Sequence, residues 1–132
     1  MGPEVAPVLV VDDEPTIRAL VAKIVERAGY RSDVARDGAD AIEKLEKRRY
    51  SVLIIDLMMP VMDGYALVEW VKGHVSPRPA IIVVSAGDSA ALRRLDGSVV
   101  HSVIRKPFDV DVLSDLIAAA RNQGTGEGEK RK

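Results

Sequence analysis

The sequence contains no cysteine, which excludes disulfide bonds, thiolate metal sites and cysteine nucleophiles. Aromatic residues make up only 4% of the 132 residues, and neither charge sign predominates, because 19 Lys and Arg stand against 20 Asp and Glu. Because the numbers of basic and acidic residues are nearly equal, the net charge gives no electrostatic attraction to nucleic acid or to an anionic membrane. We therefore expect neither as a partner. No apolar run approaches the ~18 residues that cross a bilayer, and the start, MGPEVAP, lacks the regions of a signal peptide. These absences favour a cytoplasmic protein.

What remains is the composition of an ordinary globular domain, with 47% hydrophobic and 30% charged residues. The length suits one domain with a single sizeable core. We expect this domain to cover residues 1–121, with its core starting near residue 7. Residues 122–132 (NQGTGEGEKRK) are rich in glycine and charge and have no apolar anchor, which predicts a disordered C-terminal tail.

Short, almost wholly apolar segments indicate strands that are covered on both faces, as in a parallel sheet. The predicted strands are residues 8–11, 52–55, 80–84 and 99–104, with a weaker edge strand at 31–35. Between them, apolar residues recur at three- and four-residue steps, which is typical of amphipathic helices. The predicted helices lie around residues 17–28, 41–47, 67–71, 89–95 and 112–120. The alternation predicts an α/β fold of five βα units, with a five-stranded parallel sheet doubly wound by helices on both faces.

Polar side chains stand where four of the predicted strands end. The first strand is followed by Asp12 and Asp13, the third by Asp56, the fourth by Ser85 and the fifth by Lys106. In open α/β sheets, ligands bind outside the carboxyl ends of the strands, so we expect these groups to converge on one rim. Each residue alone has an ordinary explanation, such as a helix cap, a turn or a solvated surface lysine. Their occurrence together at separate strand ends favours a functional site.

Clustered carboxylates constrain the chemistry of such a site. Two like unit charges ~4 Å apart cost about 4 kcal/mol at an effective dielectric constant near 20. Three acidic side chains together must therefore raise their pKa values or bind a cation. Oxygen ligands without histidine or cysteine suit Mg²⁺. A carboxylate held between Mg²⁺ and the positive charge of Lys106 is placed to attack phosphorus.

These residues resemble the receiver domain of two-component response regulators, of the chemotaxis-regulator type. The resemblance covers about residues 7–121 and rests on four motifs in order. They are VLVVDDE at 8–14, DLMMPVMDG at 56–64, SAG at 85–87 and RKPF at 105–108. It implies a flavodoxin-like (βα)5 fold with the strand order 2-1-3-4-5, an order known from the chemotaxis member of the family.

The resemblance also implies a role for each residue at the rim. Asp56 would accept a phosphoryl group from a histidine kinase or a phosphotransfer protein. Asp13 would ligate Mg²⁺, or Mn²⁺ in its place, directly and Asp12 mainly through water, and the carbonyl oxygen of Met58 would be a further ligand.

On the phosphoryl side of this site, Ser85 and Lys106 would bind oxygens, and Pro107 would follow a cis peptide bond. Such a domain is a signalling switch rather than an enzyme, apart from its own phosphorylation and dephosphorylation. We expect the chain to be a single-domain regulator that is a monomer or a weak dimer. Its expected downstream target is a protein that docks on the face made by helix 4, strand 5 and helix 5.

One position departs from the family pattern. The family usually carries an aromatic residue three positions before the conserved lysine, whereas this chain has Val103. A switch that rotates an aromatic ring at this position is therefore unavailable, and a non-switching receiver that serves as an interaction scaffold is the alternative reading. An aspartate-nucleophile phosphatase is a weaker rival, because those enzymes place a DxD pattern after the first strand and this chain has adjacent Asp12 and Asp13.

Overall fold

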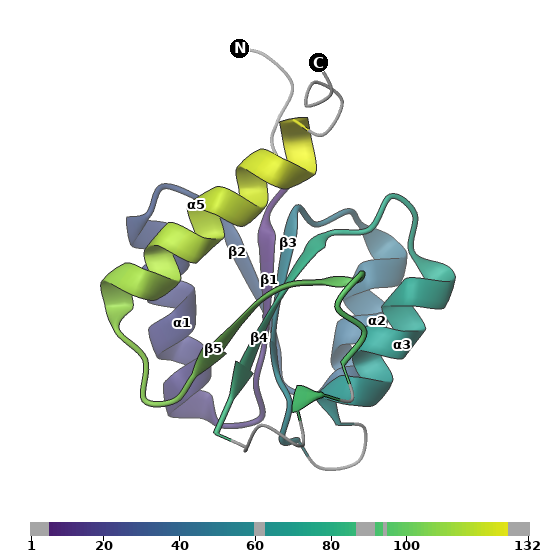
Figure 1. The fold of residues 1–132 in the computed structure, drawn as a ribbon, viewed down its shortest axis with the longest axis horizontal. Helices are drawn as coiled ribbons and strands as arrows, with labels where there is room; N and C mark the ends of the chain where they lie inside the picture. Colours follow the sequence, from purple (N-terminus) through teal and green to yellow (C-terminus); the bar gives the residue numbers. More distant parts are fainter. Residues whose placement is uncertain (1–5, 60–62, 87–91, 94, 127–132) are drawn as a thin grey trace.

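Five parallel strands form one sheet in the order β2-β1-β3-β4-β5 (Figure 1). The structure is a computed structural model that describes residues 6–59, 63–86, 92–93 and 95–126. The strands are β1 (Val8–Val11), β2 (Ser32–Ala35), β3 (Val52–Asp56), β4 (Ala80–Ser85) and β5 (Val100–Arg105). The parallel sheet predicted from the apolar segments is confirmed, as is the strand order implied by the resemblance.

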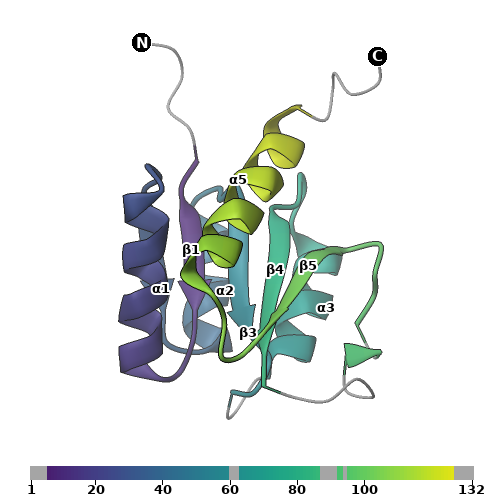
Figure 2. The ribbon, with the colours of Figure 1, turned by 60° about the vertical axis from the view of Figure 1, so that its left-hand side comes forward.

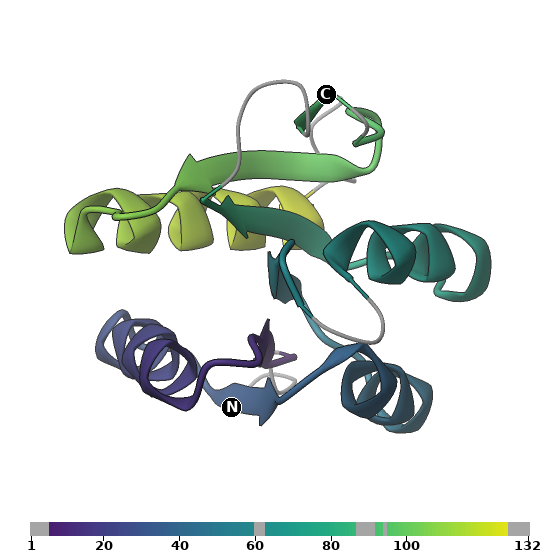
Figure 3. The same cartoon turned by 90° about the horizontal axis from the view of Figure 1, so that it is seen from below.

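Helices cover both faces of the sheet (Figure 3). They are α1 (Pro15–Arg27), α2 (Gly38–Lys47), α3 (Gly64–His74) and α5 (Val110–Gly126). Seen along the sheet, α1 and α5 lie on one side and α2 and α3 on the other. The short helix expected at 89–95 falls mostly on residues outside the described part of the chain. The doubly wound α/β architecture is confirmed.

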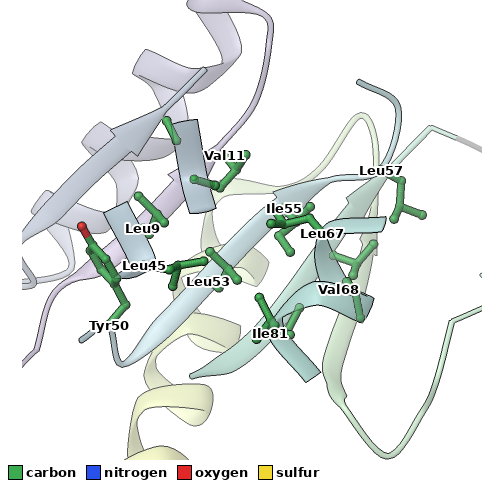
Figure 4. Close-up of a cluster of buried hydrophobic side chains, with 14 of the residues drawn as sticks. Leu9, Val11, Leu45, Tyr50, Leu53, Ile55, Leu57, Leu67, Val68 and Ile81 are labelled. Atoms are coloured by element: carbon green, nitrogen blue, oxygen red, sulfur yellow. The ribbon is translucent and has the colours of Figure 1, made fainter. Parts of the chain in front are cut away.

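The strands are continuously apolar because successive residues face different helix layers. Leu9 and Val11 belong to the core cluster under α2 and α3, whereas Val8 and Val10 belong to the cluster under α1 and α5. Figure 4 shows the first cluster, where strand residues such as Ile55 pack with helix residues such as Leu67. A side chain that is buried on either face adds to stability at ~25 cal/mol per Å² of apolar surface removed from water. This two-sided burial holds the strand ends, and hence the rim, in place.

Local signals fix the helix boundaries. Gly29 has a φ of +98°, and its N–H donates to the carbonyl oxygen of Glu26 at 3.0 Å, which ends α1. Asp63 precedes α3 and its carboxylate accepts from the N–H of Ala66 at 3.0 Å. A cap of this kind contributes about 1 kcal/mol. It anchors α3 directly after the loop that follows β3.

At the C-terminus, α5 continues to Gly126, past the domain end expected at residue 121. The first residues of the segment expected to be a disordered tail are therefore helical. The physical reason is that an established helix gains one hydrogen bond for each residue it adds, so a polar sequence is enough to extend it. Residues 127–132 lie outside the described part, and the expectation for them stays a prediction.

The edges of the sheet are partly open. Figure 2 shows β5 at one edge, beyond β4, and Val103 in this strand keeps 41% of its surface exposed. Among the helices that the structure describes, none is both long and apolar enough to cross a bilayer.

Candidate functional site

Three carboxylates meet at the carboxyl ends of β1 and β3. Asp56 is the last residue of β3, Asp12 directly follows β1, and both are buried, while the neighbouring Asp13 is exposed. One oxygen from each of the three lies within 4.8 Å of the others. Because β1 and β3 are neighbours in the sheet, the two strands deliver their aspartates to the same edge. The sequence prediction that these side chains converge is confirmed.

Main-chain groups fix the orientation of the two buried carboxylates. The N–H of Glu14 donates to Asp12 Oδ1 at 2.9 Å, and the N–H of Met58 donates to Asp56 Oδ1 at 3.2 Å. Arg18, one turn into α1, donates from Nη1 to the carbonyl oxygen of Asp12 at 2.9 Å. The loop after β1 is thus tied to α1, which keeps the acidic side chains in one arrangement.

Lys106 brings the opposing charge. Its Nζ lies 3.6 Å from Asp56 Oδ2 and 4.0 Å from Asp12 Oδ2, and its side chain is 26% exposed. The peptide bond between Lys106 and Pro107 is cis, as the resemblance implied. The N–H of Lys106 also donates to the carbonyl oxygen of Ser85 at 2.9 Å. Buried Ser85, the last residue of β4, is in this way placed beside the same rim.

The electrostatics of the site favour the binding of a cation. Burial, and after it the negative charge of Asp12, raises the pKa of Asp56 to about 6, although Lys106 opposes the shift. Burial also raises the pKa of Asp12. One lysine faces three carboxylates, so the ionised cluster keeps a net negative charge. Converging carboxylate oxygens form a set of ligands that suits Mg²⁺. Because one of the three residues, Asp13, is exposed to solvent, the site also suits an ion that keeps several of its waters.

A dependence of stability on pH follows from the raised pKa. With a folded-state value of about 6 and an unfolded value of about 3.9, folded Asp56 binds protons more tightly than the unfolded chain. Its contribution is therefore most favourable below about pH 4 and is lost as the pH rises through 6. We expect Asp56→Asn to stabilise the metal-free protein at pH 7 by on the order of 2 kcal/mol, and this gain to vanish near pH 4.

Urea unfolding of both proteins in a chelating buffer measures this difference. The comparison between the two proteins cancels the other effects of acid on stability, because these effects are common to both proteins. A constant difference between pH 4 and pH 7 would mean that Asp56 is not destabilised by its surroundings.

Two residues that support the site were not recognised from the sequence. In the sequence, Arg18 has the pattern of an ordinary surface residue of an amphipathic helix. The spacing of the residues does not reveal its hydrogen bond to the carbonyl oxygen of Asp12. Gly64 starts α3, and a Cβ atom there would lie 2.7 Å from Leu57 Cα and 2.8 Å from the carbonyl oxygen of Asp56. The dipeptide Asp63-Gly64 indicated a turn but not this close approach.

The histidines lie in other contacts. The Nδ1 atom of His74 is 2.9 Å from the carbonyl oxygen of Trp70, and that of His101 is 2.6 Å from Ser102 Oγ. These contacts are made with groups outside the carboxylate cluster, and the interpretation that neither histidine is catalytic stays a prediction. The role of the Met58 carbonyl oxygen as a metal ligand stays a prediction, although the N–H of the same residue already contacts Asp56.

Comparison with known proteins identifies the class. The family model of the response regulator receiver domain matches residues 8–118. The chain therefore belongs to the receiver domains of two-component signalling systems, a family whose members bind Mg²⁺ at an acidic pocket and interact with histidine kinases and downstream effectors.

Solved structures agree with this assignment. The receiver domain of the Francisella response regulator 1452 is 29% identical, with a TM-score of 0.80 over 89% of this chain and 98% of that one. The chemotaxis protein CheY4 of Vibrio cholerae is also 29% identical, with a TM-score of 0.78 over 89% and 99%.

Among curated relatives, the sensor histidine kinase RcsC of Salmonella typhimurium is 33% identical over 111 residues, which cover 84% of this chain and 12% of the relative. The DNA-binding transcriptional regulator NtrC of Escherichia coli is 32% identical over 113 residues, which cover 86% and 24%. The chain thus spans a quarter or less of the length of these two relatives.

Proposed function

We propose that Asp56 accepts a phosphoryl group from the phosphohistidine of a histidine kinase or phosphotransfer protein, in a Mg²⁺-dependent reaction, and that phosphorylation changes which proteins bind. The observation that carries the proposal is the position of Asp56 Oδ2, 3.6 Å from Lys106 Nζ and inside the carboxylate cluster. This places one nucleophilic oxygen beside a fixed positive charge and beside ligands for a divalent cation.

The proposed reaction is a transfer between two side chains. An oxygen of Asp56 attacks phosphorus, the bond from phosphorus to the imidazole nitrogen breaks, and the nitrogen keeps the electron pair and takes up a proton. The N–H of Met58 holds Oδ1 of Asp56, which limits the rotation of the carboxylate. Lys106 Nζ stands where it neutralises charge on the phosphoryl oxygens, and Ser85 at the end of β4 supplies a hydroxyl.

A cation complements these groups. Asp13 and Asp56 would hold Mg²⁺ directly and Asp12 mainly through water, and the ion would supply charge neutralisation for the incoming phosphoryl group. A phosphoryl group adds about −1.5 to −2 charge at pH 7. The single positive charge of the lysine does not neutralise this charge together with that of the three carboxylates. We further propose that the chain turns over no separate substrate and only gains and loses its own phosphoryl group.

Labelling with acetyl phosphate, a small donor that bypasses the kinase, tests this function. We expect Asp56 to be labelled in the presence of Mg²⁺ or Mn²⁺ and to stay unlabelled in a chelating buffer, with labelling restored by excess Mg²⁺. Equal labelling with and without the chelator would refute the role of the metal.

Val103 supports a second candidate, a receiver that acts as an interaction scaffold without switching. Its side chain is 41% exposed on β5, where the family usually carries an aromatic ring. Under the first proposal, the signal passes instead through Ser85 and the chain between β4 and β5, toward the face of helix 4, β5 and α5. Amide NMR shifts with and without beryllofluoride distinguish the two candidates, because a scaffold would show no change over residues 85–106.

A further inference from the structure

A second cleft lies at the end of the molecule opposite the carboxylates. It encloses about 460 Å³ between the C-terminal ends of α2 and α3 and the segments that lead from them into the sheet. Binding sites for small molecules commonly span about 300 to 1,000 Å³. The cleft shares no lining residue with the phosphoryl-acceptor site, and nothing in the proposed phosphoryl transfer uses it.

One wall of this cleft is a stacked pair of rings. Trp70 and His74 lie with their centroids 4.6 Å apart and their planes within 7° of parallel. Because a carbonyl oxygen only accepts, His74 Nδ1 carries the hydrogen in its 2.9 Å contact with the Trp70 carbonyl oxygen, and this bond fixes the imidazole. Trp70 also packs against the core cluster under α2 and α3. The aromatic wall is therefore preformed.

The facing wall carries positive charge. Lys47, Arg48 and Arg49 line the cleft together with a single acidic residue, Glu46. Lys47 and Arg48 stand at the C-terminal end of α2, where cations compensate the helix dipole.

Two of these cations already have partners. Arg48 pairs with Asp33 at 3.2 Å, and Lys47 pairs with Glu43 at 3.6 Å in an exposed contact of little energetic weight. Arg49 lies beyond the helix and has no ion-pair partner within the described residues. In the described part of the chain, the position of Arg49 is therefore explained neither by helix capping nor by an ion pair.

We propose that this cleft binds a small organic anion with a planar aromatic body. The ring of the ligand would stack on the wall of Trp70 and His74, and its anionic group would pair with Arg49 and Lys47. Arginine suits this role because its planar guanidinium donates to anionic oxygens in a forked geometry. The partial negative charge of the two helix ends disfavours an anion, but it acts within the last turn and is opposed by full charges on the basic wall.

Trp70 makes the proposal directly testable, because it is the only tryptophan in the sequence. The probe is anilinonaphthalenesulfonate, which has an aromatic body and one negative charge, and energy transfer from Trp70 reports its binding. The matched probe is phenylnaphthylamine, which lacks the sulfonate. We expect saturable binding of the sulfonate, about tenfold tighter than that of the neutral dye, the equivalent of one charged contact.

Variants assign the signal to the cleft. We expect Arg49→Gln to weaken the sulfonate about tenfold and to leave the neutral dye and the melting temperature unchanged, since Arg49 is exposed. Lys23→Gln is the control, because Lys23 lines the separate cleft of about 370 Å³ between α1 and α5. Asp56→Asn should bind the sulfonate like the wild type, which separates this site from the phosphoryl acceptor. Equal affinity for the two dyes, or an Arg49→Gln variant that binds the sulfonate unchanged, would overturn the proposal.

Discussion

Replacing Asp56 by asparagine is expected to reduce labelling by acetyl phosphate to background, because the nucleophile is lost. The amide has nearly the size of the carboxylate but lacks a nucleophilic anionic oxygen. The Asp56 side chain is buried at the end of β3, with Lys106 Nζ 3.6 Å away. Among the described residues, the other carboxylate paired with that cation is buried Asp12, whose Oδ2 lies farther away at 4.0 Å. Radiolabelled acetyl phosphate followed by gel electrophoresis measures the loss.

Asp115→Asn is the matched control, because Asp115 is an exposed aspartate on α5, away from the rim. This variant should be labelled like the wild type. The melting temperature of Asp56→Asn should be at least as high as that of the wild type at pH 7, since the substitution removes a buried charge. Undiminished labelling of the Asp56→Asn variant would show that the phosphoryl group goes to another residue.

Gly64→Ala is expected to destabilise the protein by about 1 to 3 kcal/mol, the usual cost of overpacking a filled site. The new methyl group would stand 2.7 Å from Leu57 Cα and 2.8 Å from the carbonyl oxygen of Asp56, and both are main-chain atoms that cannot rotate away. The loop between β3 and α3 must therefore shift. Because that loop carries the N–H that orients Asp56, we also expect slower labelling by acetyl phosphate.

Gly73→Ala in the same helix is the control for the effect of replacing glycine by alanine without a close contact. A Cβ atom at Gly73 meets nothing within 4 Å, and the residue lies in the last turn of α3. Alanine there should stabilise the protein by about 0.5 to 1 kcal/mol through its better helix propensity. Urea unfolding of the two variants gives both values. If the two substitutions changed the free energy of unfolding equally, the close approach at Gly64 would have no energetic consequence.

Much of the fold was predictable because its signals are local. The apolar strands are continuous since both of their faces are covered, and this pattern distinguishes a parallel sheet from an antiparallel one. The residues of β1 were predicted at their observed bounds, and β3 and β4 each extend by one residue to include Asp56 and Ser85. The end of α5 was missed because the glycine-rich sequence after residue 121 gives no apolar periodicity to follow.

The acidic site was predictable because it depends on strand ends, which the sequence shows directly. Asp12, Asp13, Asp56 and Lys106 come together because parallel strands of one sheet all end at the same edge, although β4 separates β5 from β3. The supporting contacts were not predictable, because they join segments through space. The bond from Arg18 to the Asp12 carbonyl oxygen and the packing of Gly64 on Leu57 depend on where α1 and α3 start relative to the sheet.

The basic and aromatic cleft escaped sequence analysis for a similar reason. Lys47 to Arg49 lie at the end of α2 and Trp70 lies in α3, and only the packing of both helices on one face brings them together. In the sequence, Trp70 is interpreted as a residue that is either packed in the core or partly exposed. That interpretation is confirmed, but it does not reveal the stacked His74 or the facing arginine.

A crystal structure with Mg²⁺ and beryllofluoride tests the central claim most directly. We expect the ion to be bound by the carboxylates of Asp13 and Asp56 and the carbonyl oxygen of Met58, with the beryllofluoride on Asp56 and in contact with Lys106 and Ser85. An ion bound away from Asp56, or a Lys106 side chain directed into solvent, would contradict the account.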